Sequence, residues 1–175
     1  MGKKYICFLS GDRVDLAVIG TEYTDFILQL LNNPEVRHYL AGRFPWTPVS
    51  VEKMIDRTAK RKSIHFVIID KTSDNPAGLI TLNDFNWPNR RAMLSIAVMP
   101  EFQNAGIGKK ATELIMDYAF NTLGLRKLCL EVYGFNKRAV SMYKKLGFKI
   151  EGEFKNHSLK DGEYHTLLYM TMTRE

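Results

Sequence analysis

The chain has 175 residues, of which 45% are hydrophobic and 25% are charged, a composition that excludes intrinsic disorder and predicts one folded domain over residues 1–175. No apolar stretch is long enough to span a bilayer, residues 1–8 lack the apolar run of a signal peptide, and Cys7 and Cys129 have no metal or redox spacing, so we expect a cytoplasmic protein without a metal. The formal net charge of +6 favours an anionic partner such as a phosphorylated cofactor, but without a long basic run it does not predict nucleic acid as the main ligand.

The first half of the chain is predicted to contain two strands, three helices and three further strands. In chain order these segments are 5–9, 13–19, 22–31, 34–40, 51–62, 64–70, 77–85 and 91–99. Pro34 is well placed to open the second helix, and Ser50 is expected to cap the third. Because short polar turns separate the last three strands, these strands are expected to form an antiparallel meander.

The second half begins with a glycine-containing loop and a helix that runs to about Leu123, where Gly124 is expected to end it. A strand, a helix and two closing strands are predicted to follow, at 125–133, 136–146, 148–154 and 164–173. This order of elements is typical of an α+β fold with a βαβ-like crossover in its second half.

The loop before the first of these helices has the chemistry of an anion-binding site. Gly106 and Gly108 have no side chains, so backbone N–H groups can point at phosphate oxygens, and the helix N-terminus adds a partial positive charge. Lys109 and Lys110 strengthen the positive field. The alternative interpretation is a plain turn between strand and helix, with glycines that allow tight packing.

Residues 106–111 also match the G-x-G-x-x-A pattern of dinucleotide-binding folds, but three observations disfavour a nicotinamide or flavin enzyme. Residues 100–105 separate the pattern from its strand, whereas the dinucleotide fingerprint follows its strand directly. The preceding strands resemble hairpins rather than parallel βαβ units, and too little chain follows for the second half of such a fold. The pattern also lacks the Gly-Lys-Ser/Thr ending of a Walker loop.

Two sequence segments together resemble the GNAT superfamily of N-acetyltransferases. QNAGIG at 103–108 resembles the acetyl-CoA pyrophosphate loop, written Q/R-x-x-G-x-G/A. KLCLEVYGFNKRAVSMYKKLGFKIEGE at 127–153 resembles the next strand, the loop asparagine and the helix that ends in Tyr-x-x-x-Gly-Phe. The resemblance is strong over 91–173. It is looser over 1–90, where LLNNPEVRHYL is similar to the subgroup of ribosomal-protein N-terminal acetyltransferases and spermidine acetyltransferase.

The resemblance implies a fold and a division of roles along the chain. The fold is a mixed, mostly antiparallel central sheet flanked by helices, with a splay between the strand before the glycine loop and the next strand. Residues 1–90 would form the acceptor side, and residues 91–173 would bind acetyl-CoA, the cosubstrate. The residues implied to contact acetyl-CoA are Ile96, Ala97, Val98, Gln103, Asn104, Ala105, Gly106, Ile107, Gly108, Lys109, Asn136 and Lys145.

Within this set the resemblance assigns different parts of the cofactor to different residues. The strand at 96–98 would line the pantetheine arm, the loop backbone would hold the pyrophosphate, and Asn136 would contact the arm or an ordered water. Lys145 forms a basic helix face with Lys137 and Arg138. This face either helps to bind other cofactor phosphates or is a solvated surface.

Tyr143 occupies the family position of the general acid that protonates the leaving thiolate. A phenol with an ordinary pKa of about 10 suits a thiolate of similar basicity, and backbone N–H groups of the strand before the loop suit the oxyanion. The alternative interpretation is that Tyr143 has only a packing role, as an apolar helix residue that contacts the sheet. No base is assigned: residues 93–95 lack the carboxylate that some relatives carry, and Glu131, His65 and His165 each have a structural interpretation.

The expected acceptor is a primary amine, either a peptide N-terminus or a small molecule such as an amino sugar, an amino acid or a polyamine. It is expected to contact residues 34–48 and the turns near Asp84 and Lys160. In spermidine acetyltransferase the first loop is acidic, whereas residues 41–46 here read AGRFPW, and Arg43 would repel a polyamine. A catalytically silent acyl-CoA-binding or regulatory module of the same fold stays open as the alternative function, and a homodimer stays open as the assembly.

Overall fold

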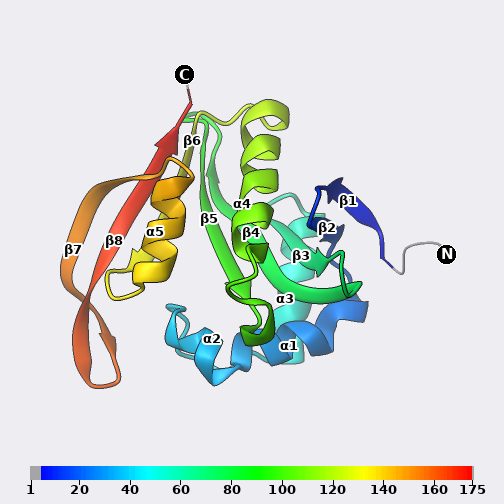
Figure 1. Ribbon diagram of the computed structural model, residues 1–175, viewed down its shortest axis with the longest axis horizontal. Helices are drawn as coiled ribbons and strands as arrows, with labels where there is room; N and C mark the ends of the chain where they lie inside the picture. The colour runs from blue at the N-terminus through cyan, green and yellow to red at the C-terminus, as the bar shows by residue number, and fades with distance from the viewer. Residues whose placement is uncertain (1–4, 175) are drawn as a thin grey trace.

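The structure, a computed structural model, describes residues 5–174 as one eight-stranded sheet with helices on both faces (Figure 1). The strands lie in the order β1-β2-β3-β4-β5-β6-β8-β7. Their bounds are β1 Cys7–Ser10, β2 Val14–Val18, β3 Ile64–Asp70, β4 Asn75–Asn86, β5 Arg91–Val98, β6 Lys127–Tyr133, β7 Lys149–Lys160 and β8 Glu163–Thr173. Within the described part of the chain, only β5 and β6 pair in parallel. The predicted α+β fold with a mixed, mostly antiparallel sheet is therefore confirmed.

The helices cover the two faces of the sheet with separate apolar clusters. The helical segments are η1 Thr21–Tyr23, α1 Thr24–Asn32, α2 Pro34–His38, α3 Pro48–Ala59, η2 Pro100–Phe102, α4 Ile107–Asp117, η3 Tyr118–Thr122 and α5 Lys137–Lys145. One cluster joins α1, α2 and α3 to the sheet through residues such as Ile27, Val36 and Val51. The other joins α4 and α5 to it through residues such as Ile115 and Val140. Because both faces are covered, β3 reads as a nearly continuous apolar run.

The start of α3 differs from the sequence-based expectation, which placed the helix cap at Ser50. The Thr47 side chain accepts a hydrogen bond from the Ser50 backbone N–H at 3.3 Å, and the Ser50 hydroxyl accepts one from the Thr47 N–H at 3.4 Å. This reciprocal pair is a capping box. Pro48 takes the first helical position, where a missing N–H is tolerated, so the helix begins earlier than predicted.

The final hairpin is longer than the sequence predicts, because β7 continues past residue 154 to Lys160. Its pairing with β8 shifts between Phe154 and Ser158, where Asn156 has a φ of 50°. Such an irregularity interrupts the alternation of side chains, so the pattern of the second part of the strand is hidden in the sequence. The extension brings the hairpin tip into contact with α2.

β5 and β6 separate along their length, which confirms the predicted splay. Their parallel pairing covers only 91–93 of β5 and 127–129 of β6, although β5 continues to Val98 and β6 to Tyr133. On their outer sides both strands stay paired, β5 with β4 and β6 with β8. The backbone groups that face the gap therefore have no partner strand, and they are available to a ligand.

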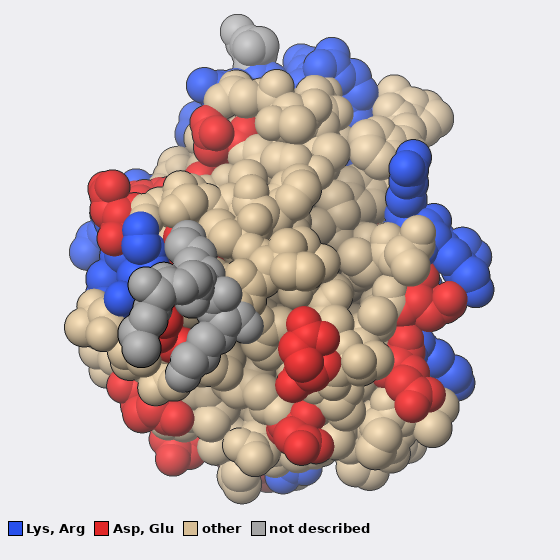
Figure 2. Space-filling model, turned by 90° about the vertical axis from the view of Figure 1, so that its right-hand side faces the viewer, with Lys and Arg blue, Asp and Glu red and all other residues tan. Residues whose placement is uncertain are grey.

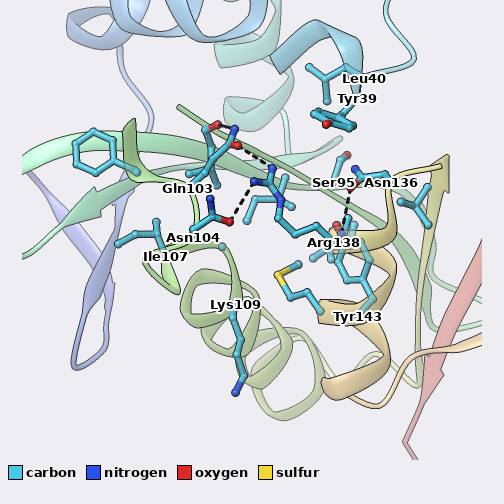
Figure 3. Close-up of a pocket in the computed structure, with 18 of the residues that line it drawn as sticks. Tyr39, Leu40, Ser95, Gln103, Asn104, Ile107, Lys109, Asn136, Arg138 and Tyr143 are labelled. Atoms are coloured by element: carbon cyan, nitrogen blue, oxygen red, sulfur yellow. Dashed lines mark hydrogen bonds between the residues drawn. The ribbon is translucent and has the colours of Figure 1, made fainter. Parts of the chain in front are cut away.

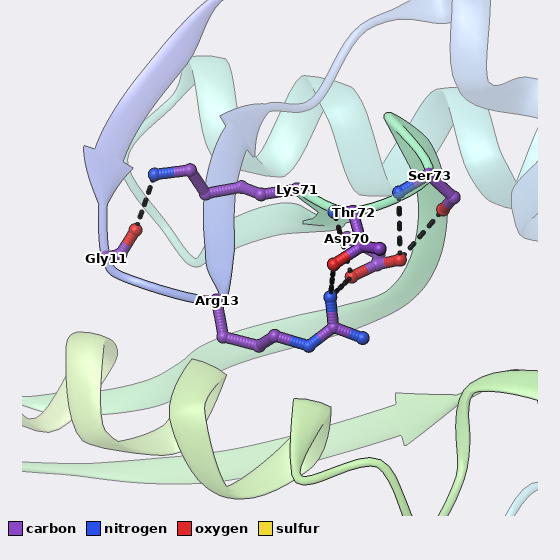
Figure 4. Close-up of polar contacts among 6 residues, drawn as sticks. All are labelled: Gly11, Arg13, Asp70, Lys71, Thr72 and Ser73. Carbon is purple, nitrogen blue, oxygen red and sulfur yellow. Dashed lines mark hydrogen bonds and ion pairs between the residues drawn. The ribbon is translucent and has the colours of Figure 1, made fainter.

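A buried carboxylate ties the residue before β2 to the end of β3 (Figure 4). Arg13 forms an ion pair with Asp70, and the Ser73 backbone N–H and hydroxyl donate to the other Asp70 oxygen at 3.2 and 2.8 Å. Lys71 donates to the Gly11 carbonyl at 2.8 Å beside this cluster. Because Asp70 is buried, loss of Arg13 would leave an uncompensated charge and destabilise this end of the sheet.

The face at the β1 edge of the sheet carries exposed apolar side chains. Ile6, Phe8 and Val18 are exposed there, and Figure 2 shows uncharged groups across much of this face. No helix among residues 5–174 is long and apolar enough to cross a membrane. Residues 1–4, part of the stretch in which no signal peptide is expected, lie outside the described residues.

Candidate active site

A cavity of about 320 Å³ lies at the gap between β5 and β6 (Figure 3). Its walls come from the end of β5, the glycine loop, the first turn of α4, β6 and α5. Most of the predicted site residues line it, namely Ile96, Val98, Gln103, Asn104, Gly106, Ile107, Gly108, Lys109, Asn136 and Tyr143. The two motif segments therefore meet where the strands separate.

Three of the predicted contact residues do not line the cavity. Ala97 points to the other face of β5 and is buried in the cluster under α1 and α3, so only its backbone runs along the gap. Ala105 is exposed in the loop, and Lys145 is exposed at the end of α5. Lys137 borders a separate groove beside β7 and β8. A role for these residues in cofactor binding stays a prediction.

The glycine loop leaves the N-terminus of α4 open toward the cavity. Gly106 precedes the helix with a φ of 77°, a left-handed conformation that glycine adopts without strain. No described side chain caps α4, in contrast to α3 and α5. The first backbone N–H groups of α4 are therefore available to an anion. A Cβ at Gly106 would meet no atom within 4 Å, so within the chain it is the backbone conformation that favours glycine.

Arg138 spans the cavity from α5 to the glycine loop, a contact that the sequence did not predict. Its Nη2 donates to Gln103 Oε1 at 2.7 Å, and its Nη1 donates to Asn104 Oδ1 at 3.4 Å (Figure 3). Gln103 in turn donates from Nε2 to the Val98 carbonyl at 3.0 Å. The guanidinium carbon lies 5.9 Å from the centroid of the Tyr39 ring. Arg138 therefore places a positive charge beside the open end of α4.

Tyr143 is held at the cavity by α5. The helix begins after Asn136, whose side chain accepts a hydrogen bond from the Ala139 N–H at 3.1 Å. Two turns later Tyr143 lies on the same side of the helix, in an edge contact with Phe148 at 5.6 Å between ring centroids. Burial raises the pKa of the Tyr143 phenol above its ordinary value, so the phenol stays protonated at neutral pH. A protonated phenol at this place can donate a proton to a ligand.

The cavity is lined from both faces of the sheet. The apolar side chains of β5 pack under α4 and α5, whereas Ser95 lies on the opposite face with its hydroxyl 3.0 Å from that of Thr81. Strand alternation places Glu131 of β6 on the same opposite face. Tyr39 and Leu40, which follow α2, line the cavity on this side (Figure 3). Two ligands can therefore meet in the gap from opposite faces.

Sequence reasoning named Glu131 but missed the other lining residues of the acceptor face, Ser95, Tyr39 and Leu40. Ser95 was considered only as part of a segment without a carboxylate, although alternation along β5 was sufficient to place it opposite the apolar side chains. Tyr39 and Leu40 come from a segment that was expected on the acceptor side, but no pattern in that segment singles them out. Their position depends on how α2 packs against the sheet.

Two candidate bases, His65 and His165, lie outside the cavity lining. His65 is buried in β3, with Nδ1 2.8 Å from the Thr58 hydroxyl oxygen, and burial together with the Arg57 charge lowers its pKa to about 4. His165 in β8 packs against Phe135, at 4.9 Å between ring centroids. Among residues 5–174 no group of three or more His, Cys, Asp or Glu side chains is arranged to hold a metal ion.

Comparison with known proteins finds relatives over most of the chain. The Acetyltransferase (GNAT) domain family matches residues 15–149. Spermidine N(1)-acetyltransferase of Escherichia coli (strain K12) is 32% identical over 161 residues, which cover 92% of this chain and 86% of that protein.

Solved structures of acetyltransferases superpose on nearly the whole chain. Spermidine N-acetyltransferase from Vibrio cholerae, in complex with CoA and spermine, has a TM-score of 0.86 at 26% identity and covers 93% of this chain and 96% of its own. Ribosomal-protein-S5-alanine acetyltransferase from Vibrio fischeri shares the fold, with a TM-score of 0.84 at 17% identity over 97% of both chains. Since the family match spans most of the sequence and the Escherichia coli relative aligns over nearly all of it, the chain belongs to the GNAT family and is an acetyl-CoA-dependent amine N-acetyltransferase.

Proposed function

We propose that the protein moves an acetyl group from acetyl-CoA to a primary amine that attacks the thioester directly. The observation that carries this proposal is the two-sided lining of the gap between β5 and β6. One face offers the open N-terminus of α4 and Arg138 to the anionic cofactor, and the other offers Ser95 and Glu131 to an incoming amine. Ligands that enter from opposite faces would meet in the gap, as direct transfer requires.

The residues around the loop fit coenzyme A. The N–H groups of 106–109 at the start of α4 suit the pyrophosphate, and Arg138 can add charge-assisted hydrogen bonds to it. The β5 backbone at 94–98 has no partner strand toward β6 and suits the amide groups of the pantetheine arm. The side-chain amide oxygen of Asn136 accepts the hydrogen bond that caps α5. The side-chain NH₂ group of Asn136 is therefore left to donate to the arm or to a water.

The transfer needs a neutral amine, a stabilised oxyanion and a proton for the leaving thiolate. As the amine nitrogen bonds to the acetyl carbon, backbone N–H groups of β5 near Val98 donate to the carbonyl oxygen, where negative charge develops. When the C–S bond breaks, Tyr143, which is protonated at neutral pH, donates its proton to the sulfur. The proton that the amine loses leaves by way of water on the face of Ser95 and Glu131. The place of Tyr143 in the cavity argues against a catalytically silent module.

The acceptor class is set, in this proposal, by α2 and the loop that follows it, within the acceptor-side half at 1–90. The two relatives named for spermidine favour a polyamine. Residues 41–46, however, contain no carboxylate, and Arg43 and Phe44 are exposed among them. A polycation finds no counter-charge there, whereas an acceptor with a carboxylate or phosphate does. A peptide N-terminus, an amino acid or an amino sugar therefore ranks ahead of a polyamine.

An amine panel tests the proposed function. Release of CoA from acetyl-CoA would be followed with a thiol reagent in the presence of spermidine, an amino acid, an amino sugar or a peptide with a free N-terminus. We expect release to saturate with at least one of these amines, and we expect its N-acetylated form to be inactive. If acetyl-CoA binds but none of the amines accelerates release, the silent acyl-CoA-binding module becomes the better account.

A further inference from the structure

The tip of the β7–β8 hairpin brings a lysine to the acceptor side of the cavity. Lys160 donates from Nζ to the carbonyl oxygens of Arg37, at 3.0 Å, and Leu40, at 3.3 Å, where α2 ends. The same Nζ lies 5.4 Å from the centroid of the Tyr133 ring. Carbonyl oxygens at the end of a helix and the face of an aromatic ring are groups that hold an ammonium ion. We call this arrangement of Arg37, Leu40 and Tyr133 the ammonium site.

The ammonium site adjoins the cavity. Leu40 belongs to both, because it lines the cavity and its carbonyl accepts a hydrogen bond from Lys160. The Tyr133 ring stacks on Phe135 at 4.9 Å between centroids, and Phe135 packs against Tyr39, another lining residue, at 6.2 Å. One aromatic wall therefore connects the acceptor end of the cavity with the place where Lys160 is held.

The ammonium site contains no carboxylate. Among the described residues Lys160 takes part in no ion pair, and the neighbouring Asp161 pairs with His38 at 3.6 Å. Arg37 adds a second positive charge on α2. A second ammonium group that entered this site would have to displace Lys160 and would meet its positive charge, and the adjacent Asp161 carboxylate already lies 3.6 Å from His38.

We propose that Lys160 is a specificity-determining residue, because it fills an ammonium site that adjoins the acceptor end of the cavity with the chain's own side chain. Filled in this way, the site rejects the second ammonium group of a diamine or polyamine and admits an acceptor with a single amine. This inference rests on the proposed function and refines its acceptor. The competing account is a structural role alone, in which Lys160 ties the hairpin to α2. That account predicts no change in the preference between amines when Lys160 is replaced.

Binding of two amines to the CoA-saturated protein tests this inference without turnover. Spermidine carries several ammonium groups and butylamine carries one, and calorimetry gives a dissociation constant for each. Lys160→Met keeps the apolar stem of the side chain and removes its charge. We expect it to increase the affinity for spermidine relative to butylamine by about tenfold or more. Lys155→Met, exposed on the same hairpin, is the matched control and should leave the ratio of affinities as in the wild type.

An unchanged ratio in a folded Lys160→Met variant would overturn the inference. If that variant does not fold, Lys160→Gln takes its place, since it retains a donor for the two carbonyls without the charge. Lys160→Arg should keep the wild-type ratio because it keeps the positive charge. This inference is tested by amine binding in the presence of CoA. The proposed function is tested separately, by amine-dependent release of CoA, so failure of one can be told apart from failure of the other.

Discussion

Arg138 on α5 and Gln103 in the glycine loop are joined by a hydrogen bond of 2.7 Å across the cavity, although 35 residues separate them in the sequence. The bond sets a positive charge beside the uncapped N-terminus of α4. Gln103 also donates to the Val98 carbonyl, so the loop, the end of β5 and the start of α5 are connected around the gap. This arrangement brings together the free backbone donors and the positive charge that binding of an anion requires.

Replacement of Arg138 by methionine should weaken acetyl-CoA binding by about tenfold to a hundredfold, because a hydrogen bond to a charged group contributes about 1.5–3 kcal/mol. Calorimetric titration with acetyl-CoA measures the change. Lys144→Met is the matched control, since Lys144 is exposed on the same helix and does not line the cavity. Equal affinities in Arg138→Met and the wild type would contradict the assignment. The same titration of Lys145→Met shows whether Lys145 contributes to acetyl-CoA affinity.

The Tyr143→Phe variant should lower kcat by about a hundredfold or more while it keeps acetyl-CoA affinity, since the ring remains and only the proton donor is lost. Because burial raises the pKa of Tyr143, loss of its proton should not limit the wild-type rate below pH of about 10. The measurement is kcat as a function of pH. Tyr118→Phe serves as the control, because Tyr118 lies outside the cavity lining. A kcat for Tyr143→Phe equal to that of the wild type at every pH would leave Tyr143 a packing role only.

Gly106→Ala should lower the free energy of unfolding by about 1 kcal/mol, because alanine is strained at a φ of 77°. A Cβ there meets no neighbouring atom, so the loss comes from the backbone conformation. Gly106→Asn is the comparison, since asparagine tolerates the left-handed region and should lose less. Urea unfolding of the three proteins gives the values. If Gly106→Ala were as stable as the wild type, the loop would have to hold a different conformation.

The free energy of unfolding should fall as the pH drops below about 6.5, because His65 is held neutral in the folded protein. Burial, with a smaller contribution from the Arg57 charge, lowers the pKa of His65 from 6.5 to about 4. Between these values the unfolded chain binds a proton that the folded protein does not, so the stabilisation is complete above pH 6.5 and is lost toward pH 4. From pH 7 to pH 5 we expect a loss of about 2 kcal/mol.

Urea unfolding at a series of pH values checks the role of His65. The His65→Asn variant has no group that titrates in this range at that position, so its stability should change less between pH 7 and pH 5. The range from pH 5 to pH 7 lies above the ordinary pKa values of carboxylates. Carboxylates therefore contribute little to the change of the free energy of unfolding with pH in this range. The same slope in both proteins would assign the pH dependence to other groups.

The elements that could be predicted from the sequence are those with a local signal. The strand expected at 64–70 is β3, Ile64–Asp70, because burial on both faces gives an uninterrupted apolar run. The splay followed from the two motif segments at 103–108 and 127–153, and the pairing of β5 with β6 confirms it. The cap of α3 was placed wrongly because Thr47 and Ser50 are both good N-cap residues, and the proline after Thr47 decides between them.

The parts of the site that could not be predicted depend on contacts between distant segments. Lys160 reaches the Arg37 carbonyl across 123 residues of sequence, and the path of β7 beyond 154 depends on the irregular pairing at Asn156. A long basic side chain looks the same in the sequence whether it is solvated or contacts a distant segment, because its partner is set by tertiary packing. Periodicity and motifs contain no such information.

The melting temperature with saturating acetyl-CoA tests most directly the central claim that the glycine loop at the gap between β5 and β6 is a coenzyme A site. A ligand that binds only the folded protein at about 100 times its Kd adds about 2.7 kcal/mol, which should raise Tm by about 5–10 °C for a domain of this size. We predict such a rise with acetyl-CoA, a smaller rise for Arg138→Met at the same concentration, and none with NAD. No rise with acetyl-CoA, or an equal rise with NAD, would contradict the claim.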